Sequence, residues 1–327
     1  MLRPSSLGVL GLTVLILVSV WGYLAFRRDL SASRQRLRGT SRVIDTACGP
    51  IEYAETGSGI PLLIVHGAGG GFDQGMELGR PLADQGFRVI AMSRFGYLGT
   101  PLPADASPAA QAAAHAALLD ALGLPRAAIL GGSAGAPSAM QFAIRHPDRC
   151  AALVLLVPLA YKPPEAAPSA PVLSPWAEKL LAAIVGSNAA YWIAARFARN
   201  MVIKRVLATP PQVVRFATPA ERARVSRIVD DIMPISSRAQ GLLNDARMAA
   251  SLTRYELERI KAPTLVFSLR DDLYGTFANA AYTARGIPGA RFVGYDSGGH
   301  VWVGHNEEMI AETALFLKSH SRLSTAP

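Results

Sequence analysis

The chain has 327 residues, of which 50% are hydrophobic and 17% are charged. This composition supplies a large apolar core and excludes intrinsic disorder as the general state of the chain. The formal net charge is +9, but most of the excess lies within residues 1–42, so we expect no nucleic-acid-binding face on the folded part. The two cysteines, Cys48 and Cys150, have no metal-ligand spacing and support no disulfide framework.

An uncharged apolar run, LGVLGLTVLILVSVWGYLAF, occupies residues 7–26. As a helix it would be about 30 Å long, which is the thickness of the hydrocarbon core of a bilayer. The alternative is a cleaved signal peptide, but the run is longer than the apolar region of such peptides and no clear small-x-small cleavage site follows it. We therefore expect a tail (1–6), a single transmembrane anchor (7–26) and a basic juxtamembrane linker (27–41).

The flanks of this run predict its orientation. Six arginines follow it within residues 27–42, whereas Arg3 and the amino terminus precede it. The positive-inside rule places the arginine-rich flank in the cytoplasm. We expect a single-pass membrane protein with a cytoplasmic folded domain and with membrane lipid as the partner of its N-terminal helix; no pattern in the sequence predicts the oligomeric state.

After residue 42, short apolar runs alternate with helix-like stretches, which is typical of a largely parallel sheet with helices on both faces. One helix is predicted to begin with Ser107 as its cap and Pro108 as its first residue and to end at Leu122, and another to cover 134–145. The predicted strands are 51–55, 61–66, 87–92, 127–131, 151–157, 264–268 and 291–295.

The alternation stops between residues 159 and 258. A Pro-rich stretch, YKPPEAAPSAPVLSP, leads there into a long segment with helical but no strand signals, and Thr218 followed by Glu221 predicts a capping box. A helical insertion in such an alternation predicts a lid over the carboxyl edge of the sheet, where these folds bind ligands. The expected organisation is a core of residues 42–158 and 259–320 with a lid at 159–258.

The predicted lid mixes large apolar side chains with a net charge of +5. Ordinary amphipathic packing is one interpretation. The other is a pocket wall for an apolar acyl group, with the basic side of the lid against anionic lipid. The large apolar residues are Trp176, Tyr191, Trp192, Phe197, Met201 and Met233.

Residues 131–135 read GGSAG and match G-x-S-x-G between a predicted strand and a predicted helix. A sharp strand-to-helix turn exposes the serine hydroxyl, and the helix N-terminus favours negative charge that develops there. The alternative is a Gly-rich turn with an incidental serine, but chance seldom supplies the flanking strand and helix as well. Ser133 is therefore the predicted nucleophile.

A second Gly-rich loop, HGAGGG at 66–71, follows an earlier predicted strand. Acyl transfer needs donors for an oxyanion, and the usual pair is the amide after the nucleophile and one amide of this loop. We assign Ala134 and Ala68, with Gly69 as the substitute for Ala68, and interpret His66 as a structural histidine. A nucleotide-binding loop is the rival, but GK[ST] and a dinucleotide signature are missing. No cofactor and no metal is predicted.

Two later strands end in candidate acids and a candidate base: SLRDD carries Asp271 and Asp272, and SGGH carries His300. The 28 positions between Asp272 and His300 leave room for one helix and one strand. The side chains are therefore expected at the same sheet edge as Ser133, in the order Ser, Asp, His.

Four other histidines compete with His300 as the base. His305 lies in a loop before the last helix and is the strongest competitor. His115 and His146 are interpreted as surface positions, and His320 lies in the tail. The strand-end position favours His300.

The segments HGAGGG, GGSAG, HPDRCAALVLLVP, APTLVFSLRDD and SGGH, in this order, resemble the α/β-hydrolase family over residues 48–320. The likeness is to its capped branch, which includes carbon–carbon bond hydrolases, haloperoxidase-like enzymes and esterases. It implies a mostly parallel, eight-stranded-type α/β sheet with a helical lid and a Ser-His-Asp triad. In such relatives the second of two adjacent acids is usually the triad member, which favours Asp272. Serine at the elbow argues against the branches with an aspartate nucleophile.

The expected function is hydrolysis of a carboxylic ester, or a related acyl bond, of a small to medium and largely apolar substrate. The alternatives are a carbon–carbon bond hydrolase, an acyltransferase using the same acyl-enzyme, and a non-catalytic ligand-binding scaffold.

Overall fold

The computed structural model describes residues 4–162, 182–183 and 185–321, and eight strands in this part form one sheet. The strand order is β1-β2-β4-β3-β5-β6-β7-β8. The pairs β1–β2 and β2–β4 are antiparallel, and all the other neighbours are parallel, so the mostly parallel sheet is confirmed. The strands are β1 (Arg42–Thr46), β2 (Gly49–Thr56), β3 (Ile60–Val65), β4 (Phe87–Met92), β5 (Ala127–Gly132), β6 (Cys150–Leu156), β7 (Thr264–Leu269) and β8 (Arg291–Tyr295).

No strand was predicted at β1. This strand forms a hairpin with β2, in which Arg42 lies opposite Tyr53 and Thr46 opposite Gly49. It lies at the edge of the sheet and none of its five residues is buried. An edge strand without a buried face has no strong alternation of apolar and polar residues, so the usual strand signal is weak here.

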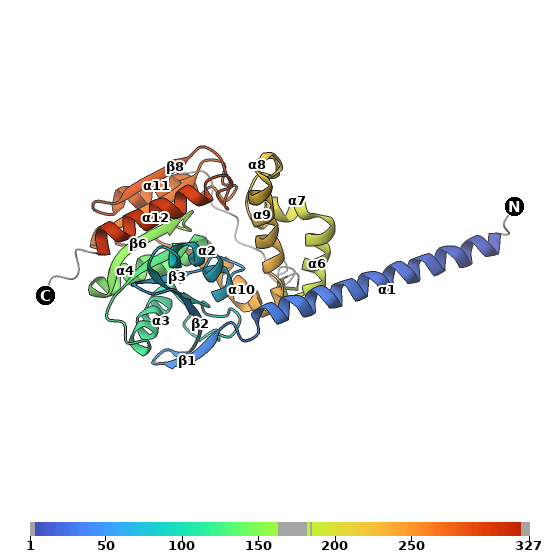
Figure 1. The fold of residues 1–327 in the computed structure, drawn as a ribbon, viewed down its shortest axis with the longest axis horizontal. Coiled ribbons are helices and arrows are strands. Elements are labelled where there is room, and N and C mark those ends of the chain that lie inside the picture. The colour runs from blue at the N-terminus through green and yellow to red at the C-terminus, as the bar shows by residue number, and fades with distance from the viewer. Residues whose placement is uncertain (1–3, 163–181, 184, 322–327) are drawn as a thin grey trace.

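Helices cover both faces of the sheet, as Figure 1 shows. Leu62 and Ile64 of β3 belong to the apolar cluster shared with α2 (Phe72–Ala83) and α12 (Asn306–Ser321). Leu63 and Val65 point the other way and belong to the cluster shared with α3 (Pro108–Ala121), α4 (Ala136–Arg145) and α11 (Thr276–Gly286). This alternation follows from the two-residue period of a strand.

Between β6 and β7 the chain leaves the sheet and forms a helical insertion. Thr218 caps one of its helices by accepting a hydrogen bond from the amide of Glu221, as predicted. The Glu221 side chain binds Arg224 at 2.8 Å. The described helices are α6 (Asn188–Phe197), α7 (Arg199–Arg205), α8 (Pro211–Phe216), α9 (Pro219–Asp231) and α10 (Ala239–Ser251). Most of the Pro-rich stretch, with Trp176, lies outside the described residues.

Helix α1 (Pro4–Leu37) is continuous and projects away from the folded part (Figure 1). Its segment Gly11–Leu37 is long and apolar enough to cross a membrane, although a signal sequence would pass the same test. The helix continues through the stretch that was expected to be a linker. Leu30 of that stretch belongs to the apolar cluster of the helical insertion, and Phe26, at the end of the apolar run, packs against the same cluster. The end of α1 is therefore part of the folded unit.

The interpretation of His115 as a surface residue is wrong. His115 is fully buried between α3 and α4, where its ring contacts Met92 Sδ and Ser138 Oγ at 3.0 Å each. Burial, with a smaller contribution from Arg94, lowers its pKa to about 3. His146 is half-buried. The alanine-rich sequence of α3 hid the buried face, because small side chains give a helix little amphipathic contrast.

The burial of His115 predicts how stability depends on pH. An imidazole titrates near 6.5 in an unfolded chain, whereas that of His115 titrates at about 3 in the fold. The unfolded state therefore binds the extra proton below pH 6.5, and the free energy of unfolding falls as the pH is lowered toward 3. His115→Gln keeps a donor for Ser138 and cannot titrate, so it should lose less stability than the wild type between pH 7 and pH 5 in urea denaturation. The prediction would be contradicted if the free energy of unfolding of the two proteins fell by the same amount between pH 7 and pH 5.

Candidate active site

Ser133 lies on a strained turn directly after β5. Its φ is +47°, a left-handed conformation that is unusual for a residue other than glycine. The turn needs the glycines around it. A Cβ at Gly135 would lie 2.4 Å from the backbone oxygen of Val65, and one at Gly131 would lie 2.7 Å from Cβ of Ala139. The helix α4 begins at Ala136, not at 134, because residues 133–135 form a separate 3-10 turn.

Three predicted side chains meet at the carboxyl edge of the sheet. His300 Nε2 lies 2.8 Å from Ser133 Oγ. The other ring nitrogen, Nδ1, lies 2.8 Å from Oδ2 of Asp272. When the Nδ1–H of His300 donates to Asp272, Nε2 is left as the acceptor for the serine hydroxyl. The arrangement can therefore remove the proton of Ser133.

The two adjacent aspartates have different partners. Asp272 is buried; it also accepts hydrogen bonds from the amide of Tyr274 and the hydroxyl of Thr276. Asp271 instead accepts from the amides of Gly298 and Gly299, at 3.1 and 2.8 Å. Asp272 thus contacts the imidazole, while Asp271 holds the loop that leads to it.

The Gly-rich loop 66–71 is held by hydrogen bonds from several directions. The Gly67 amide donates to Gln74 Oε1 at 2.8 Å, the Gly69 amide to the Tyr97 hydroxyl at 3.4 Å, and the Gly70 amide to the Gly67 carbonyl at 3.3 Å. For the amide of Ala68, which lies between Gly67 and Gly69, the described part of the chain contains no such bond. Ala68 therefore has an amide available for a ligand.

His66 has a structural position, as interpreted from the sequence. Its Nδ1 lies 2.7 Å from the Gly67 carbonyl, and its Nε2 accepts from the Arg94 amide at 2.9 Å. Burial, with help from Arg94, lowers its pKa well below the usual value, so the ring is neutral. His305 is likewise engaged elsewhere: it stacks on Tyr295 and contacts the carbonyl of Ser297.

A short segment of the helical insertion, residues 206–209, contacts the loops of both the acid and the base. The carbonyl of Ala208 accepts from the amide of Leu273 at 2.9 Å and from that of His300 at 3.4 Å. Thr209 Oγ1 accepts from the amide of Val301 at 3.3 Å. The insertion is therefore part of the support of the candidate site.

Arg238 connects the helical insertion to the Gly-rich loop. Its side chain is fully buried, and each of its five N–H donors has an acceptor. Two donors bind the carboxylate of Asp73, the second residue after the loop, and one binds the carbonyl of Gly70. The other two bind the carbonyls of Asp231 and Ile232.

The N-terminal helix reaches the same cluster. Arg36 of α1 binds Asp73 Oδ2 at 2.8 Å and the carbonyls of Asp231 and Met233 at 2.9 and 3.2 Å. Burial alone would raise the pKa of Asp73, but Arg238 and Arg36 outweigh it and lower the pKa to about 2. The carboxylate therefore stays charged at neutral pH and joins α1, the insertion and the core.

A second buried pair links the insertion to the core. Arg94 and Asp245 of α10 form two hydrogen bonds of 2.7 Å. The hydroxyl of Tyr97 donates a hydrogen bond to the same carboxylate at 2.5 Å and accepts one from the Gly69 amide. Motif reasoning missed Tyr97, Arg94, Arg238 and Asp73. The only signal was local: Asp73 and Gln74 follow HGAGGG after a single residue, Phe72.

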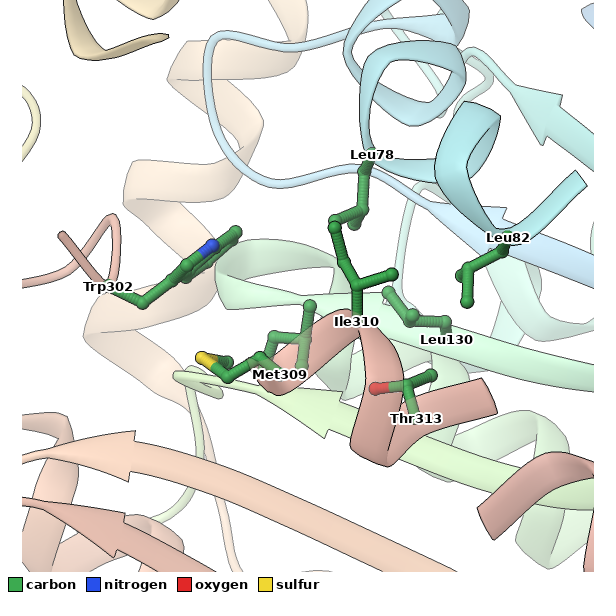
Figure 2. Close-up of a pocket in the computed structure, with 8 residues that line it drawn as sticks. Leu78, Leu82, Leu130, Trp302, Met309, Ile310 and Thr313 are labelled. Carbon is green, nitrogen blue, oxygen red and sulfur yellow. The ribbon is translucent and has the colours of Figure 1, made fainter. Parts of the chain in front are cut away.

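An apolar pocket lies elsewhere, between α2 and α12 (Figure 2). Ser133, Asp272 and His300 do not line it, so it is separate from the candidate site. Its lining residues are Leu78, Leu82, Leu130, Leu156, Trp302, Met309, Ile310 and Thr313. Within the part of the chain that the structure describes, no group of three His, Cys, Asp or Glu side chains could hold a metal ion.

Comparison with known proteins agrees with this geometry. Residues 60–303 match the family described as the alpha/beta hydrolase fold. The protein named uncharacterized hydrolase YcgS of Bacillus subtilis (strain 168) is 29% identical over 275 residues, which are 78% of this chain and 90% of that protein. An alpha/beta hydrolase fold protein from Nakamurella multipartita has a TM-score of 0.65 at 28% identity, with 85% of this chain and 99% of that chain covered.

A shorter match is to 2-hydroxy-6-oxo-6-phenylhexa-2,4-dienoate hydrolase of Comamonas testosteroni. It is 33% identical over 113 residues, which are 33% of this chain and 40% of that enzyme. The resemblance inferred from the motifs is confirmed by the family match.

Gly135→Ala should destabilise the fold and displace Ser133. The added Cβ would lie 2.4 Å from one backbone oxygen and 2.6 Å from another, and neither can move easily. We expect the free energy of unfolding to fall by about 1–3 kcal/mol, measured by urea denaturation. Gly132→Ala is the matched control, because a Cβ there meets nothing within 4 Å. Equal stability of the two variants would contradict the close approach at Gly135.

Arg36→Ala should loosen the attachment of α1 to the folded part. The change removes three hydrogen bonds and leaves Asp73 with one cation fewer. Because the Arg36 side chain is one-third exposed, we expect a loss of only about 1–2 kcal/mol in the free energy of unfolding. The control is Arg34→Ala, an exposed arginine on the same helix. If both variants unfold at the same urea concentration, the contact contributes no stability.

Proposed function

The chain belongs to the α/β-hydrolase fold family and is a hydrolase, and from this premise we propose a serine hydrolase that forms an acyl-enzyme on Ser133. The substrate is a carboxylic ester or a related acyl compound. The single observation that carries the proposal is the hydrogen-bonded chain from Ser133 Oγ through His300 to Asp272, with both contacts at 2.8 Å.

In the proposed first half-reaction, His300 Nε2 takes the proton of Ser133 as Oγ attacks the acyl carbon. Asp272 holds the imidazole in orientation and stabilises the imidazolium. The tetrahedral intermediate collapses when His300 gives that proton to the leaving alkoxide. In the second half, a water gives a proton to His300, its oxygen attacks the acyl-enzyme, and the proton returns to Ser133 as the acid leaves.

The oxyanion is proposed to bind the amides of Ala134 and Ala68. Ala134 follows the nucleophile at the start of the 3-10 turn, where backbone N–H groups have no partner within the helix. Ala68 is preferred to Gly69, because the Gly69 amide already donates to Tyr97. Two such donors stabilise the oxyanion most strongly when the fold already holds them in position before the reaction begins.

The proposed acyl group is small to medium and largely apolar. The candidate site has apolar surroundings: a Cβ at Gly69 would lie 3.6 Å from Ile232 of the insertion, and the Tyr274 ring packs edge-on to His300 at 4.9 Å. In this proposal the helical insertion acts as a lid, and residues 206–209 join it to the acid and base loops.

The protein is also proposed to be held in a membrane by α1. The exposed apolar side chains from Leu12 to Leu24 support this, since they lie on all sides of the helix. The arginine-rich flank favours a cytoplasmic folded domain. This part of the proposal is independent of the chemistry at Ser133.

Carbon–carbon bond hydrolysis is the second candidate, favoured by the partial match to a dienoate hydrolase. Both reactions would use the same nucleophile and differ in the bond that is cleaved. Identification of the products from ester and diketone-like substrates separates them. Transfer to an added alcohol would instead reveal an acyltransferase.

We expect the full-length protein in detergent to react with a fluorophosphonate probe, and Ser133→Ala and His300→Ala to abolish the labelling. Turnover of an ester should fall by about 10⁴-fold or more in both variants, because they remove the nucleophile and its base. Asp272→Asn should cost about 10³–10⁴-fold, since the amide favours the wrong tautomer of His300.

Asp271→Asn is the matched control, because Asp271 directly precedes Asp272 in the sequence and its carboxylate binds the amides of Gly298 and Gly299 instead of the imidazole. It should lose much less activity than Asp272→Asn. Unchanged labelling in Ser133→Ala would refute the assignment of the nucleophile. No labelling of the folded wild type, with no activity on any acyl substrate, would favour a ligand-binding scaffold.

A further inference from the structure

The helices α6 and α7 expose large apolar side chains where a soluble helix would expose polar ones. Ile193 and Phe197 lie one turn apart on α6, and Met201 lies on α7 after the break at Ala198; they are 53%, 70% and 52% exposed. The opposite side of α6, with Tyr191 and Trp192, is already buried in the insertion. Large exposed apolar side chains on two consecutive helices are a candidate interaction surface. We call these three residues the α6–α7 stripe.

The stripe is continuous with the N-terminal helix through aromatic contacts. Phe26, the last residue of the apolar run, packs edge-on to Trp192 at 5.8 Å, and Trp192 packs edge-on to Phe197 at 6.1 Å. The indole N–H of Trp192 also donates to Asp29 of α1 at 3.0 Å. In Figure 1, α6 stands beside α1 where that helix leaves the folded part. The stripe therefore lies near the level at which the apolar run ends.

The charges around the stripe fit an anionic surface. Helices α6 and α7 contain four cations and no acidic residue. One of the cations, Arg199, is paired with Asp230 of α9. The other three, Arg196, Lys204 and Arg205, are exposed. Long basic side chains beside apolar ones are typical of surfaces that bind the headgroup region of a bilayer.

We propose that the α6–α7 stripe inserts into the bilayer that α1 spans, with Arg196, Lys204 and Arg205 at its anionic headgroups. The inference rests on the proposed membrane anchoring and is independent of the chemistry at Ser133. The partner is a lipid surface, because Trp192 joins Phe197 of the stripe to Phe26 at the end of the apolar run of α1. The helical insertion is thereby held against the membrane at two places, α1 and the stripe.

The test uses the full-length chain in nanodiscs of phosphatidylcholine and phosphatidylglycerol. Cys48 is exposed and Cys150 is buried, so Cys48→Ser leaves a background into which single cysteines are placed and labelled with an environment-sensitive fluorophore. Phe197→Cys reports on the stripe and Ile16→Cys on the apolar run. Leu315→Cys on α12 is the matched control, because Leu315 is 66% exposed and apolar as well.

We expect spin-labelled lipid to quench the fluorophore at positions 16 and 197 and to leave position 315 unquenched. Quenching at 197 should correspond to a depth of about 5–10 Å, as for amphipathic helices at the interface. Each labelled variant should unfold at the same temperature as the background, which excludes misfolding as the cause.

Two results would overturn the inference separately from its premise. If position 16 is quenched and position 197 behaves like 315, the protein is anchored but the stripe does not contact lipid. If the emission at 197 changes with the number of chains per nanodisc and not with the quencher, a second copy of the chain covers the stripe. Unquenched emission at 16 would instead overturn the anchoring itself, and ester turnover with its loss in Ser133→Ala would still test the hydrolase proposal.

Discussion

The buried ion pair between Arg238 and Asp73 is the interaction on which the arrangement around the candidate site depends. Burying a guanidinium away from water costs free energy unless all its N–H donors have acceptors and a carboxylate lies beside it. Here five acceptors from the core and the insertion converge on one side chain. Because one acceptor is the carbonyl of Gly70, the pair holds the Gly-rich loop as well. The helical insertion and the loop therefore cannot move independently without exposing a buried charge.

The same cluster makes the N-terminal helix part of the folded unit. Arg36 shares Asp73 with Arg238, and Leu30 completes the apolar cluster of the insertion. A helix that only tethered the protein would need no such contacts. The attachment gives the folded part a defined orientation relative to α1, since polar contacts near residue 36 and apolar contacts near residue 26 fix two points along one rigid helix. Any surface beside these contacts then has a defined distance from the apolar run.

Much of the core and the set of site residues could be predicted from the sequence, because their signals are local. Six strands with buried residues, and the edge strand β8, are apolar runs bounded by turns. Ser133, Asp272 and His300 each follow a strand in a recognisable motif. The exposed strand β1 lacked that signal. His115 was misinterpreted because its helix consists mostly of alanine, so that the buried and exposed faces of the helix differ little in hydrophobicity. Asp271 and Asp272 could be ranked only by resemblance, since neighbours in sequence at a strand end share every local signal.

By itself, the sequence determined the alternation of strands and helices, the apolar run at the N-terminus and the Gly-rich turns that such a sheet requires. These follow from side-chain periodicity and backbone sterics within a few residues. Only the tertiary structure decided which aspartate contacts His300, that the Gly69 amide donates to Tyr97, and how Arg36 and Arg238 meet at Asp73. Such contacts join residues far apart in the chain: Arg238 lies 165 positions from Asp73. Their geometry depends on how the helices pack, which no local pattern encodes.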